Sequence, residues 1–215
     1  TNSGSLSVTG ANATGISGLS AVTIINNGIV QVAGETANAI VARGPASIQN
    51  NGEIVAAGGT GVVAHSGLDL ENNGKITGKT GVMVVEGAGP AKIVNQGYIF
   101  GSGGVAISLT SAADELTLGS KSRIEGAIKL GGGGDTVNIA LAPGRSRIIV
   151  FDDLTGATLN VSGSSRWQQI GNAVVSLDTT SLRMKQAGTA DVRTSIGEIL
   201  DGRVSRPLHD NDPGK

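Results

Sequence analysis

Short aliphatic segments separated by glycine-containing turns recur along this chain with a nearly constant period. In the clearest unit an Asn-Asn-Gly turn, or Asn-Gln-Gly in one copy, has an aliphatic residue four positions before its glycine and another two positions after it. Successive turn glycines are 24, 22 and 23 residues apart. The pattern predicts short strands joined by tight turns, with no segment long enough for a helix. The turn residues of the four copies are Asn26 and Gly28, Asn50 and Gly52, Asn72 and Gly74, and Asn95 and Gly97.

One such unit cannot bury its aliphatic face alone, but stacked units can. Coils stacked at the inter-strand spacing of about 4.8 Å would align the aliphatic columns and bury a continuous interior. We therefore predict an all-β fold, a right-handed parallel β-helix of about eight or nine coils. A meander of Asn-Gly hairpins is the alternative, although hairpins do not require matching columns at a fixed period.

The stack also predicts a structural role for the turn residues. Asn26, Asn50, Asn72 and Asn95 would lie one above the next, where their side-chain amides can form a hydrogen-bonded ladder along the axis. Asparagine and glycine tolerate the left-handed backbone conformation, and we expect the sharp corners to use it.

Composition narrows the classes of function. Glycine supplies 35 of 215 residues, aromatic residues are 2%, and the net charge is −1. The absence of cysteine excludes disulfides, thiolate catalysis and cysteine-ligated zinc. Balanced charge and few aromatic rings argue against nucleic-acid binding. No leader and no spanning segment is visible, and the chain begins in the middle of the repeat, so we expect a soluble piece of a longer protein.

Candidate catalytic groups are few and lack a recognisable setting. His65 would have to serve any Ser-His-Asp triad, but no strained nucleophile turn is evident, and a solvated turn residue is the simpler interpretation. Asp114, Glu115 and Asp135, with Arg123 or Lys129, could form the carboxylate and basic set of a polysaccharide-cleaving β-helix. No pattern in the sequence indicates that one of these carboxyl groups has a shifted pKa, as an acid/base pair requires. We assign no catalytic, cofactor or metal residue and predict that the protein is not an enzyme.

The glycine run that ends in Asp135 invites two other interpretations. It is no phosphate loop, because no Lys-Ser or Lys-Thr follows the glycines. It also differs from a calcium-binding roll repeat, because the aspartate falls one position early and the motif is not tandem. A tight glycine turn is the interpretation we favour.

The residue after each turn glycine predicts an outward column that becomes basic toward the C-terminus. Stacked cations repel each other, so a heparin-like acidic glycan or an acidic protein face on a host cell could stabilise them. The alternative is a solvated face that resists edge-to-edge association. The column contains Ile29, Glu53, Lys75, Tyr98, Arg123, Arg145 and Arg166, with Lys121, Lys129 and Arg147 nearby, and the candidate partner-binding residues are Lys75, Tyr98, Arg123, Arg145 and Arg166.

Two segments carry a resemblance to a known family. The Asn-Asn-Gly coils followed by residues 128–137 resemble the passenger domains of autotransporters, the type V secreted proteins of Gram-negative bacteria. Residues 164–177 are similar to the segment that ends pertactin-like passengers, which is regarded as an autochaperone. The resemblance implies residues 1–144 as β-helix coils, 145–190 as a C-terminal capping region, and 191–215 as a connector toward an outer-membrane translocator barrel. The expected capping residues are Trp167, Ile170, Val174, Leu177 and Leu182.

The resemblance also implies a place and a function. We expect a secreted or surface-displayed protein that has crossed the periplasm and the outer membrane, with the barrel of the same polypeptide as its first partner. Its function would be structural, adhesive and associated with virulence. A polysaccharide lyase or hydrolase and a purely structural filament module remain the alternatives.

Overall fold

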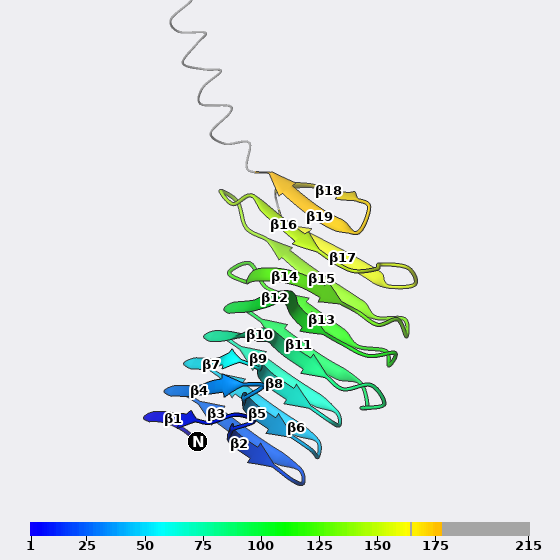
Figure 1. Cartoon of the computed structure of the whole chain (residues 1–215). Coiled ribbons are helices and arrows are strands. Elements are labelled where there is room, and N and C mark those ends of the chain that lie inside the picture. The colour runs from blue at the N-terminus through cyan, green and yellow to red at the C-terminus, as the bar shows by residue number, and fades with distance from the viewer. Residues whose placement is uncertain (164, 178–215) are drawn as a thin grey trace, which may run out of the picture. The chain divides into compact units, whose positions relative to one another are not determined.

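The computed structural model describes residues 1–163 and 165–177, and they form a parallel β-helix (Figure 1). Every regular element in this part of the chain is a strand, and no helix in it is long and apolar enough to cross a membrane. Residues Thr1–Leu177 form one compact unit, whereas Asp178–Lys215 lie outside the described residues. The expected all-β solenoid is therefore confirmed.

The described residues form seven coils, close to the predicted number. The first three coils have three strands each: β1 (Ser5–Thr9), β2 (Thr14–Gly18) and β3 (Val22–Asn26); β4 (Ile29–Glu35), β5 (Asn38–Ala42) and β6 (Ala46–Asn50); and β7 (Glu53–Gly58), β8 (Thr60–Ala64) and β9 (Leu68–Asn72). In the next coils the first two strands merge: β10 (Lys75–Val84) with β11 (Ala91–Asn95), β12 (Tyr98–Ser108) with β13 (Glu115–Leu118), and β14 (Arg123–Lys129) with β15 (Thr136–Leu141). The seventh coil contains β16 (Arg147–Val150) and β17 (Thr158–Gly163).

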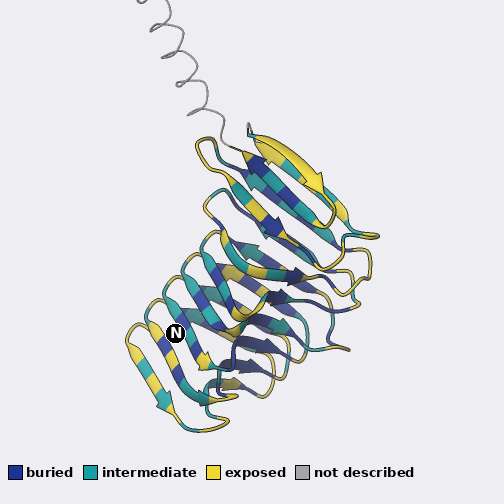
Figure 2. Ribbon diagram, turned by 45° about the horizontal axis from the view of Figure 1, so that its top comes forward, coloured by how far each residue is buried: buried dark blue, intermediate teal, exposed yellow. Residues whose placement is uncertain are grey.

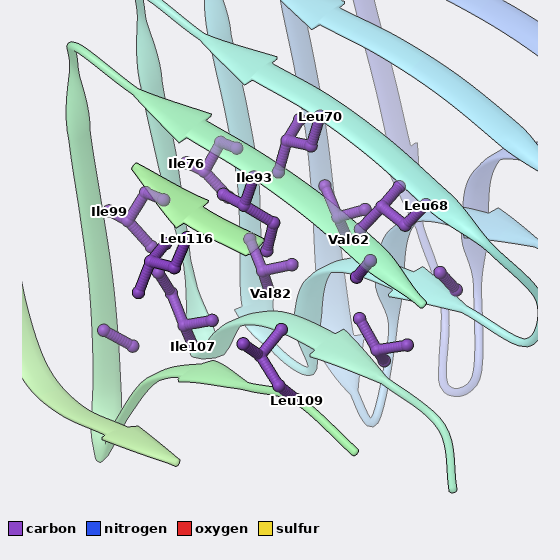
Figure 3. Packing of buried hydrophobic residues seen from close by; sticks show 14 of the residues in the cluster. Val62, Leu68, Leu70, Ile76, Val82, Ile93, Ile99, Ile107, Leu109 and Leu116 are labelled. Atoms are coloured by element: carbon purple, nitrogen blue, oxygen red, sulfur yellow. The ribbon is translucent and has the colours of Figure 1, made fainter. Parts of the chain in front are cut away.

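The strands stack into two parallel sheets with the register that the repeat predicts. A seven-stranded sheet follows the order β17-β15-β13-β11-β9-β6-β3, and a nine-stranded sheet holds the other two sides of the coils. Ile48 pairs with Leu70, and Leu70 pairs with Ile93, so the residues four positions before the turn glycines form one column. This column faces the residues two positions after the glycines, Ile76 and Ile99, across the interior (Figure 3).

The interior is aliphatic and dry along its length. Ile54, Ile76, Ile93 and Ile99 are fully buried, and Val82 and Ile107 of the second side pack against them. Figure 2 shows buried positions along the inner faces of the strands and exposed positions at the corners. Since each fully buried aliphatic side chain contributes about 1.5–3 kcal/mol, these columns are the main source of the fold's stability.

A ladder of asparagines runs through one corner of the stack. The Nδ2 of Asn26 donates to Oδ1 of Asn50 over 2.8 Å, Asn50 donates to Asn72 over 2.7 Å, and Asn72 donates to Asn95 over 2.7 Å. All four side chains are fully buried. The ladder is longer than the sequence pattern indicates, because Asn2 donates to Asn26 at one end and Asn95 donates to the Ser122 hydroxyl at the other.

The turn glycines are required for a different reason from the one that the sequence suggests. None of Gly28, Gly52, Gly74 and Gly97 has a positive φ, so the left-handed corner predicted from them is wrong. Instead, a Cβ on Gly52 would lie 2.0 Å from the carbonyl oxygen of Gly28 in the preceding coil, and Gly28, Gly74 and Gly97 have the same close contact one coil back. Glycine is present because the coils approach too closely for a side chain.

The parallel stack ends in an antiparallel sheet. Strands β18 (Arg166–Ile170) and β19 (Ala173–Leu177) form a hairpin, and β19 also pairs with β16. We call β16, β18 and β19 the cap sheet; it lies beyond the last parallel coils in Figure 1. Because these residues turn back on themselves instead of winding another coil, the described part of the stack has seven coils and not eight or nine.

Candidate binding groove

The outward column exists over five coils and then stops. Ile29 pairs with Glu53, Glu53 with Lys75, Lys75 with Tyr98, and Tyr98 with Arg123. The column requires parallel strands in register, and β16 pairs antiparallel with β19 instead of continuing from β14.

Two predicted members of the column therefore lie elsewhere. Arg145 precedes β16 in an exposed turn. Arg166 lies in β18, opposite Leu177. Placing these two residues on the column is thus wrong, although Arg145 still contributes to the site described below.

An aromatic and charged cluster lies at the C-terminal end of the column. The Tyr98 and Phe100 rings are stacked with centroids 6.2 Å apart, and the Arg123 guanidinium lies 5.0 Å from the Tyr98 centroid. The Tyr98 hydroxyl donates to Glu125 over 2.8 Å, and Arg123 forms an ion pair with the same carboxylate. The hydrogen bonds from Tyr98 and Arg123 lower the pKa of Glu125, so this carboxylate is ionised and neutralises Arg123.

A groove opens beside this cluster, where the parallel pairing breaks. Its volume is about 880 Å³, and it lies between the start of β14 and the start of β16, against the turn glycines Gly74 and Gly97. The space is present because β16 pairs with β19 and does not continue in register from β14. Four cationic side chains and one carboxylate line it: Lys121, Arg123, Arg145, Arg147 and Glu125. The groove thus gathers three of the five predicted partner-binding residues, Tyr98, Arg123 and Arg145, whereas Lys75 and Arg166 lie outside it.

Arg147 is the unusual member of the groove. Its Nη1 donates to the backbone oxygens of Gly119, over 3.3 Å, and Ala140, over 3.2 Å. Its Nη2 is buried and makes no hydrogen bond to any described residue, and no described carboxylate forms an ion pair with it. Burial, followed by repulsion from Arg145, lowers the pKa of Arg147. The guanidinium is therefore a partly buried cation without a counter-charge in the described structure.

The carboxylates that the sequence offers for catalysis serve the backbone instead. Asp114 and Asp135 are each 2% exposed. The two oxygens of Asp114 accept the amides of Ala91, over 2.6 Å, and Thr110, over 3.2 Å, and Oδ1 of Asp135 accepts the Asp114 amide over 2.9 Å. Burial raises the pKa of both carboxyl groups. Their oxygens accept backbone amides of the same coil and of the preceding coil, so they stabilise the corner before the seven-stranded sheet.

The remaining candidates lie on the surface. Glu115 forms a long ion pair with Lys92 over 4.0 Å, and His65 is exposed in the corner after β8. The four glycines 131–134 all have positive φ values between 80° and 97°, so this run is a tight left-handed turn. Within residues 1–163 and 165–177, no three acidic or histidine side chains gather where they could hold a metal ion.

The expected capping residues are only partly buried. Val174 is 1% exposed and packs on the core, but Trp167, Ile170 and Leu177 are 44%, 58% and 59% exposed. Of the four described residues, only Val174 is buried against the coils. Strand alternation explains the exposure of Ile170 and Leu177, which face away from the coils on the side opposite Val174, but not that of Trp167, which pairs with Ser176 on the same side as Val174. Leu182 lies outside the described residues.

Some residues of the site were not evident from the sequence. Glu125 does not occupy the position of the repeat that predicts the outward column. It follows Arg123 by two positions and is recognisable only from its contact with Tyr98. Arg147 could be recognised as one of several nearby cations, but not as the buried one. No protein-family model, no curated protein and no solved structure matches this chain.

Proposed function

We propose that this chain is the C-terminal part of an autotransporter passenger domain, a β-helix displayed on the bacterial surface with a structural and adhesive function. The observation that carries the proposal is the ending of the stack. The last of the seven coils contributes β16 to an antiparallel cap sheet, and the two strands of the hairpin in this sheet come from the segment that resembles the end of pertactin-like passengers. An outer-membrane barrel encoded in the same polypeptide would be its secretion partner.

An adhesive function is supported by the surface that this ending creates. The break between β14 and β16 leaves a groove with four cationic side chains on a chain whose net charge is only −1. Concentrated charge in a hollow raises the local concentration of an oppositely charged partner and speeds its association. Cleavage of a polysaccharide is less well supported, because Asp114 and Asp135 already bind backbone amides and do not line the groove.

Localisation tests the secretion route. An antibody raised against the chain should label intact cells of the source bacterium, and added protease should remove that label while a periplasmic marker remains. The gene should continue into a segment that predicts alternating membrane strands. Retention of the chain inside intact cells, or a gene that ends without such a segment, would refute the proposal.

The same proposal gives the C-terminal region a role in folding. In a chain that ends at Asp153, the partner strand of β15 and the hairpin that covers the last coils are missing. We expect this fragment to refold more slowly than the whole chain, or to aggregate, because an unpaired hydrophobic edge is exposed. Removal of residues 1–44 should cost only the contacts of the lost coils. Equal refolding of fragment 1–153 and the whole chain would exclude the folding role.

A further inference from the structure

The groove between β14 and β16 is lined by a cation, Arg147, whose charge no described carboxylate compensates. A buried cation is costly unless an opposite charge or several hydrogen bonds compensate it. Arg147 has two backbone acceptors on Nη1, but its buried Nη2 has no partner among the described residues. Arg145 adds repulsion to this position and lowers the pKa of Arg147 further. Nη2 has no exposed surface, but an anion in the groove beside it would offset the uncompensated charge of Arg147 and the repulsion from Arg145.

The other charges of the groove are arranged so that an anion can enter. Glu125 is the one carboxylate of the lining, and it is already bound by Tyr98 and Arg123. Lys121 and Arg145 are exposed at the sides and make no ion pair with any described carboxylate. The net charge available to a ligand is therefore positive, from two exposed cations and one partly buried cation.

The form of the groove indicates the class of ligand. Its volume of about 880 Å³ lies within the range of about 300–1,000 Å³ that is usual for small-ligand sites. A protein partner needs roughly 800 Å² of surface on each side, which a hollow of this kind does not offer. Nucleic acid would need an open aromatic platform, but Arg123 covers the Tyr98 ring and Glu125 binds its hydroxyl. A chain of sugars that carries anionic groups fits the hollow and the charges.

We propose that this groove binds an acidic oligosaccharide segment, with Lys121 and Arg145 donating to its sulfate or carboxylate groups while the uncompensated charge of Arg147 adds electrostatic attraction without direct contact. The inference rests on the proposed adhesive function and names the chemistry of its ligand. Sulfate esters and uronic acids share the required chemistry, and the experiment below distinguishes them.

Calorimetric titration of the full chain tests the proposal. Three probes are used: a heparin-derived oligosaccharide, a polygalacturonate-derived oligosaccharide and a neutral dextran oligosaccharide. We expect at least one acidic probe to bind with an affinity that falls as salt rises, and no binding of dextran. Which acidic probe binds more tightly identifies the anionic group. Lack of binding by both acidic probes, or equal binding of dextran, would overturn the proposal.

Matched variants place the binding in the groove. The double variant Lys121→Gln with Arg145→Gln removes two exposed cations, and its affinity should fall about tenfold or more, since it loses two charge-assisted hydrogen bonds. The control Arg43→Gln with Lys129→Gln changes the net charge equally at exposed positions outside the groove, and its affinity should be retained. Equal losses in the two double variants would show nonspecific charge attraction and refute the site.

A third variant separates an electrostatic contribution to binding from a structural role. Arg147→Met removes the buried cation but keeps an apolar stem of similar length. Its melting temperature without ligand should equal or exceed that of the parent chain, whereas its affinity for the acidic probe should fall about tenfold. Retained affinity would exclude a contribution of the Arg147 charge to binding. These measurements use the purified chain, so they can fail while surface display is confirmed, and the reverse also holds.

Discussion

The buried asparagine ladder allows a sharp test, because an exposed ladder runs directly beside it. Asn50 and Asn51 are consecutive, and each donates to one asparagine side chain and accepts from another. Asn50 is fully buried, whereas Asn51 is exposed. The substitutions Asn50→Ala and Asn51→Ala therefore remove the same atoms and the same kind of ladder hydrogen bonds in two different environments.

The structure gives the magnitude of the difference. Asn50→Ala leaves Oδ1 of the buried Asn72 without its donor, while Nδ2 of Asn26 keeps the Glu53 oxygen at 3.1 Å. One buried unsatisfied acceptor costs about 1–3 kcal/mol, and the lost hydrogen bonds add about 1 kcal/mol. We expect a total of about 2–4 kcal/mol. After Asn51→Ala, water can replace the lost partners, so the cost should stay within about 0.5 kcal/mol.

Urea unfolding followed by circular dichroism measures this difference. With a slope of about 2 kcal/mol per molar urea, the Asn50→Ala midpoint should lie about 1–2 M below that of the parent chain, and the Asn51→Ala midpoint should be almost unchanged. Coincident midpoints of the two variants would refute the claim that the ladder hydrogen bonds stabilise the fold because they are buried.

Three further outcomes follow from the described contacts. Ile93→Asp places an unpaired charge in the dry interior and should cost on the order of 5 kcal/mol, whereas Glu53→Ala on the outward column should stay within about 0.5 kcal/mol in the same urea assay. Gly52→Ala should destabilise by about 3 kcal/mol because its Cβ meets a carbonyl oxygen at 2.0 Å, while Gly4→Ala, at the same corner with open space, should be tolerated. Burial raises the pKa of Asp135 above its ordinary value of 3.8, so the folded state binds more protons than the unfolded chain, and the free energy of unfolding falls as the pH rises from the ordinary pKa through the raised one. Asp135→Asn should flatten this fall in thermal melts taken at successive pH values. An unchanged pH profile of the variant would contradict the expectation.

Much of the fold could be predicted from spacing alone. A period of 22–24 residues with two aliphatic positions fixed relative to a glycine is enough to specify which residues face inward, and Ile48, Leu70 and Ile93 lie where the period places them. The physical role of the glycine could not be predicted in this way. A close approach between coils and a left-handed turn both select glycine, and only the positions of the neighbouring atoms distinguish them.

The groove was harder to predict from the sequence because it forms where the regular repeat ends. The sequence extends the outward column through Arg145 and Arg166 by counting residues from degenerate turns. Strand β16 instead pairs with a strand that follows it in the chain by about two dozen residues, and no local pattern shows that exchange of partners. The cations were recognisable by type, but their convergence depends on this long-range pairing.

The asparagine ladder has a direction, and this bears on what an added coil meets at each end of the stack. Every Nδ2 from Asn2 to Asn95 donates toward the coil that follows, and each of those on Asn2, Asn26, Asn50 and Asn72 also donates to a backbone oxygen of a later corner, which fixes the amide orientation. A stack that grows from its C-terminal end presents an asparagine oxygen at the growing edge, and at the first rung this oxygen, Oδ1 of Asn2, accepts the Gly4 amide of its own coil over 3.3 Å. Growth from the N-terminal end presents Nδ2 donors at the growing edge, and those of Asn50 and Asn95 also donate to an oxygen of their own turn, Gly52 and Gly97. The two ends of the ladder are therefore chemically different, because a coil added at the C-terminal end meets amide donors and a coil added at the N-terminal end meets an acceptor oxygen.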